Sequence, residues 1–125
     1  MNRRFALSGR VHSVRYALQG MRLLLATQHN AWLHAAATVA VVAAGLLLEI
    51  RVSDWCWLIL AVTIVWAAEA LNTAFELLAD AVSPNFHSVV GQAKDVAAGA
   101  VLITAVGAVI IGLLVLGPYL LALLR

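Results

Sequence analysis

The sequence predicts an all-helical integral membrane protein, in which an N-terminal amphipathic surface helix precedes three transmembrane helices that form an oligomeric helical bundle. Of its 125 residues, 64% are hydrophobic and only 11% are charged, and the mean hydropathy is +0.98. Both values depart strongly from an ordinary soluble domain. Three long apolar stretches approach or exceed the roughly 20 residues that cross a hydrocarbon core. We therefore expect one membrane domain over residues 1–125.

The first element, residues 1–28, is expected to be a surface helix. From about residue 3 to residue 27, apolar and polar side chains separate onto opposite faces at helical spacing. The apolar stripe comprises Leu7, Val14, Leu18, Met21 and Leu25, and the opposite face carries Ser8, His12, Arg15, Gln19 and Arg22. Such a helix lies on the membrane and orients the first span. Its arginines are also placed to reach a phosphate.

The three spans are expected at residues 31–48, 55–80 and 95–117. The first is the shortest and contains His34, whereas the second carries Glu69 and Glu76. Ser83 and Pro84 should end the second helix, because proline disfavours helical geometry in the residue before it and serine favours turns.

The distribution of basic residues predicts the orientation. Five of the eight lie before the first span: Arg3, Arg4, Arg10, Arg15 and Arg22. The positive-inside rule then places the N-terminus in the cytoplasm, and three crossings place the C-terminus outside. Trp55 and Trp57 suit the outer interface.

Small residues recur at every fourth position of the third span, at Ala100, Thr104, Ala108 and Gly112. This pattern lets membrane helices approach closely. Three helices cannot enclose a large polar site by themselves, so we expect a homo-oligomer whose helices shield polar side chains from lipid.

The second span places Glu69, Asn72, Glu76 and Asp80 on one helical face, because they are separated by three, four and four residues. Each acidic residue near the middle of a membrane helix costs about 2.5 to 3.5 kcal/mol on insertion scales. If Asp80 lies at the cytoplasmic boundary, Glu69 lies about 16 Å deeper. These four residues, called the acidic face below, therefore indicate a functional site.

The acidic face offers oxygen ligands without thiolates, which suits Mg²⁺ better than a soft transition metal. The cytoplasmic loop adds Asp95 and Lys94, the only lysine in the chain. A magnesium site beside a lone lysine at an aqueous interface suits a nucleoside triphosphate. The sequence contains no G-x-x-x-x-G-K-[ST] loop and no protein-kinase signature, so phosphoryl transfer would use another scaffold.

Glu69 can act as a general base, because desolvation disfavours its charged form, or as a stop on a proton path. The residues alone leave three classes open: an enzyme, an ion or proton conductor, and a structural clasp between helices. His12, His29 and His34 show no metal-ligand spacing and are interpreted as interfacial side chains.

A long segment resembles the prokaryotic diacylglycerol kinase and undecaprenol kinase family. The resemblance rests on E-A-L-N-T-A-F-E-L-L-A-D from Glu69 to Asp80, on S-P-N-F-H from Ser83, and on A-K-D-V-A-A-G-A-V-L-I from Ala93. It extends over nearly the whole chain, including residues 16–22.

This resemblance implies a homotrimeric enzyme of the bacterial cytoplasmic (inner) membrane, with active sites shared between protomers. Such an enzyme moves the γ-phosphoryl group of MgATP onto a membrane lipid hydroxyl. By position, Glu69 resembles the general base, Glu76 a metal ligand and Asn72 a supporting residue. The implied ATP contacts are Tyr16, Gln28, Glu76, Asp80, Asn85, Phe86, His87, Lys94 and Asp95. The implied lipid contacts are Glu69, Arg22 and Ala98.

The chain departs from the family pattern at Gln28, where a second metal-binding glutamate is usual. A glutamine carbonyl can still ligate Mg²⁺, but it brings less charge. We therefore expect weaker binding of metal or ATP, or a shifted role for another ligand.

The acceptor lipid is expected to be diacylglycerol, with undecaprenol as the alternative. The S-P-x-x-H turn at Ser83 looks more like the undecaprenol kinase branch, whereas Gln28 fits neither branch. The rival from a different class is a proton- or ion-conducting oligomer that uses Glu69 and Glu76. Lys94, Asp95 and the extent of the family resemblance disfavour it.

Overall fold

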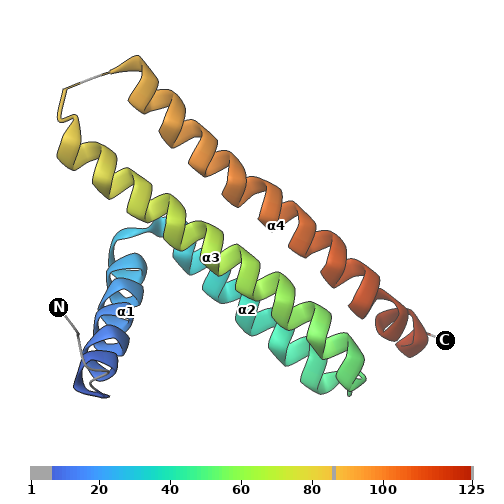
Figure 1. Ribbon diagram of the computed structural model, residues 1–125. Coiled ribbons are helices and arrows are strands. Elements are labelled where there is room, and N and C mark those ends of the chain that lie inside the picture. The colour runs from blue at the N-terminus through green and yellow to red at the C-terminus, as the bar shows by residue number, and fades with distance from the viewer. Residues whose placement is uncertain (1–6, 86, 125) are drawn as a thin grey trace.

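A computed structural model describes residues 7–85 and 87–124, so residues 1–6, Phe86 and Arg125 lie outside the described residues. The described chain forms the helices α1 (Leu7–Thr27), α2 (His29–Leu47), α3 (Val52–Val82) and α4 (Ser88–Leu123) (Figure 1). The described ranges contain no strand. The prediction of an all-helical fold is therefore confirmed.

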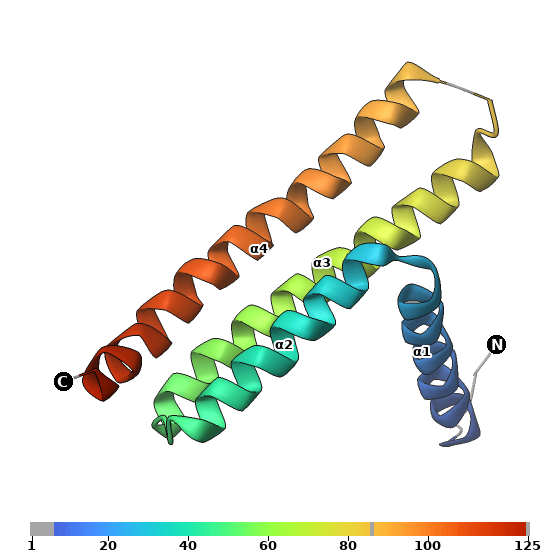
Figure 2. The same ribbon diagram turned by 180° about the vertical axis from the view of Figure 1, so that it is seen from behind.

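The helices form an antiparallel bundle with one helix leaning away from it. Helices α3 and α4 run side by side, α2 packs along α3, and α1 departs at a steep angle from the start of α2 (Figures 1 and 2). Helices α2, α3 and α4 are each long and apolar enough to span a membrane, whereas α1 is not among the candidate spans. The protein is thus a multi-pass membrane protein.

Two of the spanning helices extend beyond the expected spans. Helix α3 has 31 residues and α4 has 36, which corresponds to about 46 and 54 Å against a hydrocarbon core of about 30 Å. Helix α4 begins at Ser88 rather than residue 95 and continues through Pro118 to Leu123. An apolar segment in lipid has to satisfy its backbone hydrogen bonds internally, which favours continuing the helix past this proline.

The junction between α1 and α2 packs against α3. Gln28 has an extended backbone there, with φ −104° and ψ 117°, and its N–H still donates to the Leu24 carbonyl at 2.9 Å. Leu24 and Ala31 flank the junction and are almost completely buried. The predicted apolar stripe of α1 remains exposed at Val14 and Leu18. The face of α1 that packs on the bundle is therefore the one that carries Leu24, which the predicted stripe omitted.

The small residues of α4 border an apolar crevice of about 350 Å³ between α2, α3 and α4. Ala108 and Gly112 line it from α4, opposite Ala61 and Val65 of α3 and Thr38 of α2. The expected role of these residues in a homo-oligomer stays a prediction.

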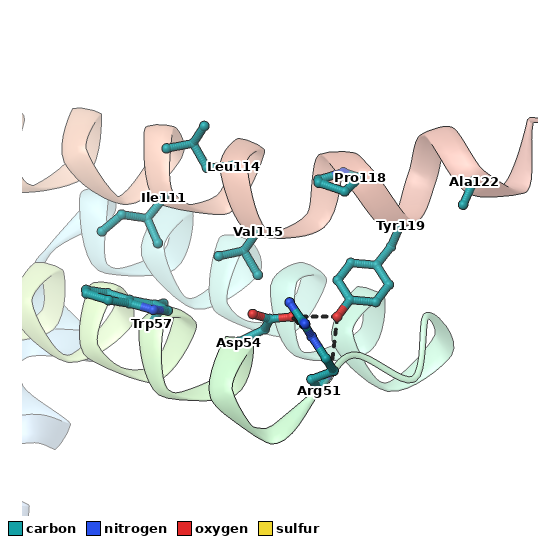
Figure 3. Close-up of a pocket in the computed structure, with 9 residues that line it drawn as sticks. All are labelled: Arg51, Asp54, Trp57, Ile111, Leu114, Val115, Pro118, Tyr119 and Ala122. Atoms are coloured by element: carbon teal, nitrogen blue, oxygen red, sulfur yellow. Dashed lines mark hydrogen bonds and ion pairs between the residues drawn. The ribbon is translucent and has the colours of Figure 1, made fainter.

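A polar clasp joins the start of α3 to the end of α4, as Figure 3 shows. The Tyr119 hydroxyl donates to Asp54 Oδ2 at 2.5 Å, and it accepts the Arg51 backbone N–H at 3.2 Å. Arg51 Nε also lies 3.3 Å from Asp54 Oδ2. Hydrogen bonding to Tyr119, and to a smaller extent to Asp54, raises the pKa of the Arg51 guanidinium above its usual value. The clasp closes the end of the bundle opposite the loop between α3 and α4.

The turn between α2 and α3 is tight because of Gly45. Ile50 N–H donates to the Gly45 carbonyl at 3.2 Å, and Glu49 takes a left-handed conformation with φ 47°, as in a helix C-cap that reverses the chain. A Cβ added at Gly45 would lie 2.7 Å from Trp55 Cη2 and 3.2 Å from Ile50 Cδ1. The indole ring is rigid, so it cannot give way locally.

We predict that Gly45→Ala destabilises the folded protein by about 1 to 3 kcal/mol, because overpacking at Trp55 outweighs the higher helix propensity of alanine. Denaturant titration in detergent micelles measures this change. Gly107→Ala is the matched control, because a Cβ at Gly107 meets no atom within 4 Å. Equal stability of the two variants would contradict the close approach of Trp55.

Candidate active site

The buried polar side chains of the described chain all lie on α3, at Glu69, Asn72 and Thr73. Glu69 is 1% exposed, Glu76 is half-buried, and the side chain of Asp80 is 70% exposed. The acidic face therefore runs from the interior of the bundle at Glu69 to solvent at Asp80. This gradient is the one that the spacing of these residues predicts.

Gln28, Asn72 and Glu76 form a hydrogen-bonded group between the α1–α2 junction and α3. Gln28 Nε2 donates to Glu76 Oε2 at 3.4 Å, and Asn72 Nδ2 donates to Glu76 Oε1 at 3.2 Å. The structure thus brings together residues that are 48 positions apart in the sequence. Both carboxylate oxygens of Glu76 are held by neutral amides.

Lys94 and Asp80 form an ion pair between α4 and α3, near the loop that joins these two helices. Lys94 Nζ lies 2.9 Å from Asp80 Oδ1, and both side chains are substantially exposed. An exposed pair of this kind adds little stability. The Lys94 ammonium group therefore remains available to an anionic ligand.

His34 of α2 lies against Glu69, a contact that sequence reasoning missed. His34 Nε2 is 3.7 Å from Glu69 Oε2. These two atoms, Glu69 Oε1, Asn72 Oδ1 and Thr73 Oγ1 are buried without a hydrogen-bond partner in the described chain. No local spacing marks His34, because its neighbour belongs to a different helix. The only available signal was a titratable residue inside a predicted span.

The remaining predicted site residues are not brought to the acidic face by the single chain. Their side chains are exposed and, among the described residues, form no hydrogen bond or ion pair with Glu69 or Glu76: Tyr16, Arg22, Asn85, His87, Asp95 and Ala98. Tyr16 stacks near His12, with ring centroids 6.4 Å apart. The Asn85 carbonyl accepts the Ser83 hydroxyl at 3.0 Å.

The oxygen-rich group around Glu76 fits Mg²⁺ by its donor chemistry. It combines one carboxylate with two amide carbonyls, and Asn72 Oδ1 is buried without a partner. Hard oxygen donors of this kind suit Mg²⁺, which keeps several waters or substrate oxygens as further ligands. No group of three His, Cys, Asp or Glu residues that could hold a metal occurs in the part of the chain that the structure describes.

These features define a class of protein: a polytopic helical membrane protein with a row of carboxylates along one spanning helix, from the buried Glu69 to the exposed Asp80. The model of the prokaryotic diacylglycerol kinase family matches residues 15–116. The chain therefore belongs to the prokaryotic diacylglycerol kinase family.

Two relatives illustrate the range of the family. The chain is 42% identical over 113 residues to a diacylglycerol kinase of Synechocystis sp., an alignment that covers 90% of this chain and 65% of the relative. It is 40% identical over 92 residues to the undecaprenol kinase of Bacillus subtilis, which covers 74% of this chain and 75% of the relative. The chain thus spans about two thirds of the Synechocystis protein's length.

We predict that Gln28→Glu lowers the Mg²⁺ concentration needed for half-maximal activity. The substitution replaces an amide donor 3.4 Å from Glu76 by a second carboxylate. The new carboxylate and that of Glu76 repel each other, and a divalent cation bound between them relieves this repulsion. Magnesium titrations of the phosphoryl-transfer rate compare the variant with wild type. An unchanged magnesium requirement would mean that Gln28 does not lie beside the metal.

Proposed function

We propose that this protein is an ATP-dependent lipid kinase that phosphorylates the hydroxyl of diacylglycerol to give phosphatidic acid, with MgATP as donor. Family membership supports a lipid kinase. The observation that carries the proposal is the position of Glu69, a carboxylate that is 1% exposed inside a spanning helix, in line with polar groups that reach the aqueous interface. A membrane lipid and a soluble nucleotide can meet only along such a gradient.

Glu69 is the proposed general base. Its two oxygens have no hydrogen-bond donor among the described residues, so each can still accept a hydrogen bond from a lipid hydroxyl group. Removal of the hydroxyl proton lets the lipid oxygen attack the γ-phosphorus. Asn72 lies one turn further along α3 and holds Glu76 through its amide. It therefore supports the site without removing a proton.

Glu76 and Gln28 are the proposed metal ligands, with Asn72 Oδ1 close to them. Mg²⁺ held by these oxygens would neutralise charge on the ATP phosphates during transfer. Lys94 would leave Asp80 to contact the phosphates, because the exposed ion pair between them is weak. Positioning and electrostatic stabilisation would then supply most of the catalysis.

A homotrimer with shared sites is the proposed assembly. The single chain leaves many apolar side chains of its spans exposed, and it also leaves Tyr16, Asn85, His87 and Asp95 exposed. A neighbouring protomer can complete the ATP site with these residues and Phe86, and the lipid site with Arg22 and Ala98. We place the enzyme in the bacterial inner membrane, with the N-terminus and the loop between α3 and α4 in the cytoplasm.

Undecaprenol is the alternative acceptor. The undecaprenol kinase of Bacillus subtilis and the diacylglycerol kinase of Synechocystis sp. have similar identities to this chain, 40% and 42%. Both lipids present a primary hydroxyl group at the membrane interface, so the same base and the same donor site would serve either reaction.

The test is transfer of labelled γ-phosphate from MgATP by the purified protein in lipid bilayers, with diacylglycerol and undecaprenol offered separately. We expect phosphatidic acid as product, with loss of at least about 100-fold in rate for Glu69→Gln, the scale of general-base catalysis. If only undecaprenol is phosphorylated, undecaprenol replaces diacylglycerol as the acceptor in this proposal. A folded oligomer that phosphorylates neither lipid would refute the kinase function.

A further inference from the structure

His34 is the titratable side chain that faces Glu69 across the helix interface. Its Nε2 lies 3.7 Å from Glu69 Oε2, and the two side chains are 16% and 1% exposed. Neither atom has another hydrogen-bond partner among the described residues. At this distance a small rotation of either side chain forms a direct hydrogen bond.

Thr38 and Trp66 link this part of α2 to α3 beside the imidazole. The Thr38 hydroxyl donates to the His34 backbone carbonyl at 2.7 Å, and Trp66 Nε1 donates to that hydroxyl at 3.0 Å. The indole of Trp66 also meets the imidazole edge to face, with ring centroids 6.5 Å apart. Trp66 and Glu69 are one helical turn apart on α3, so the same stretch of α3 holds both partners.

The other polar groups near Glu69 are engaged elsewhere or carry no charge. The Asn72 amide donates to Glu76, and Lys94 pairs with Asp80. Among the described residues, His34 is thus the side chain placed to receive a proton from Glu69.

We propose that His34 is a positioning residue for Glu69 and the acceptor of its proton after phosphoryl transfer; this inference rests on the proposed kinase function. In the first step the lipid O–H bond breaks and its proton passes to Glu69. The lipid oxygen bonds to the γ-phosphorus, and ADP leaves with the electron pair of the broken P–O bond. In the second step the Glu69 O–H bond breaks and His34 Nε2 takes the proton, which restores the carboxylate. The imidazolium then returns the proton to water.

The kinetic test compares His34→Gln and His34→Phe with wild type in the lipid phosphorylation assay. Glutamine keeps a hydrogen-bonding amide, whereas phenylalanine keeps only the ring. We expect kcat to fall roughly 10- to 100-fold in both variants, which is the usual loss when a residue that orients a functional side chain is replaced. The KM for MgATP should stay unchanged, because His34 touches no residue of the Glu76 group. His29→Gln, an exposed histidine at the start of α2, is the control and should behave as wild type.

Two outcomes would overturn the proposal. Wild-type kcat in His34→Phe would show that the imidazole only fills space, and an increase in KM for MgATP at constant kcat would place His34 in nucleotide binding. Added imidazole should restore part of the activity of His34→Ala, and a lack of rescue in a folded variant would also contradict proton transfer to this position.

A measurement without turnover separates this inference from the kinase function itself. In protein labelled with ¹⁵N-histidine, the His34 imidazole signals, identified by their loss in His34→Gln, should shift in Glu69→Gln. They should not shift in Glu49→Gln, which changes an exposed carboxylate in the turn between α2 and α3. His34 signals that do not shift in Glu69→Gln would refute the His34–Glu69 contact, even if the protein phosphorylates lipid. A shift in a protein that transfers no phosphate would leave the contact standing and refute only its catalytic use.

Discussion

A carboxylate inside the apolar part of a helical bundle loses its hydration, and only hydrogen bonds, a nearby cation or a bound proton can compensate for that loss. Neither carboxylate oxygen of Glu69 accepts a hydrogen bond from any residue in the described chain. Among the residues that the structure describes, Glu69 forms an ion-pair contact with one ionisable side chain, the His34 imidazole at 3.7 Å. The arrangement leaves the Glu69 oxygens without a hydrogen-bond donor, which costs stability but suits the proposed base, because it can still accept a hydrogen bond from a lipid hydroxyl group.

The rest of the bundle organises the approach to this carboxylate. Helix α3 carries the polar groups outward from Glu69 through Glu76 to Asp80, while the α1–α2 junction brings Gln28 onto Glu76. Lys94 reaches Asp80 from α4 at the aqueous end. In the proposed reaction, lipid and nucleotide approach the same stretch of α3 from opposite directions. The clasp of Tyr119 and Asp54 secures the far end of the same helix pair.

The helical fold and the acidic face could be predicted from sequence, because both follow from local periodicity: the apolar runs define the spans, and spacings of three and four define a shared face. Contacts between helices could not be predicted from the sequence in this way. The proximity of Gln28 to Glu76 was implied only by family resemblance, and that of His34 to Glu69 was missed. The burial of Leu24 could not be predicted for the same reason, because periodicity shows that a helix has faces without showing which face meets a neighbouring helix. In the proposed trimer, the positions of Tyr16 and Asp95 in the complete site would depend on other protomers.

The most direct test of the claim that Glu69 is buried for chemistry is to measure the unfolding midpoint of Glu69→Gln beside its phosphoryl-transfer rate. Because glutamine removes the buried charge and keeps the shape, we expect an unfolding midpoint equal to or above that of wild type, with transfer lost. A midpoint that falls in parallel with activity would show that Glu69 is a structural clasp between helices, and it would contradict the account given above.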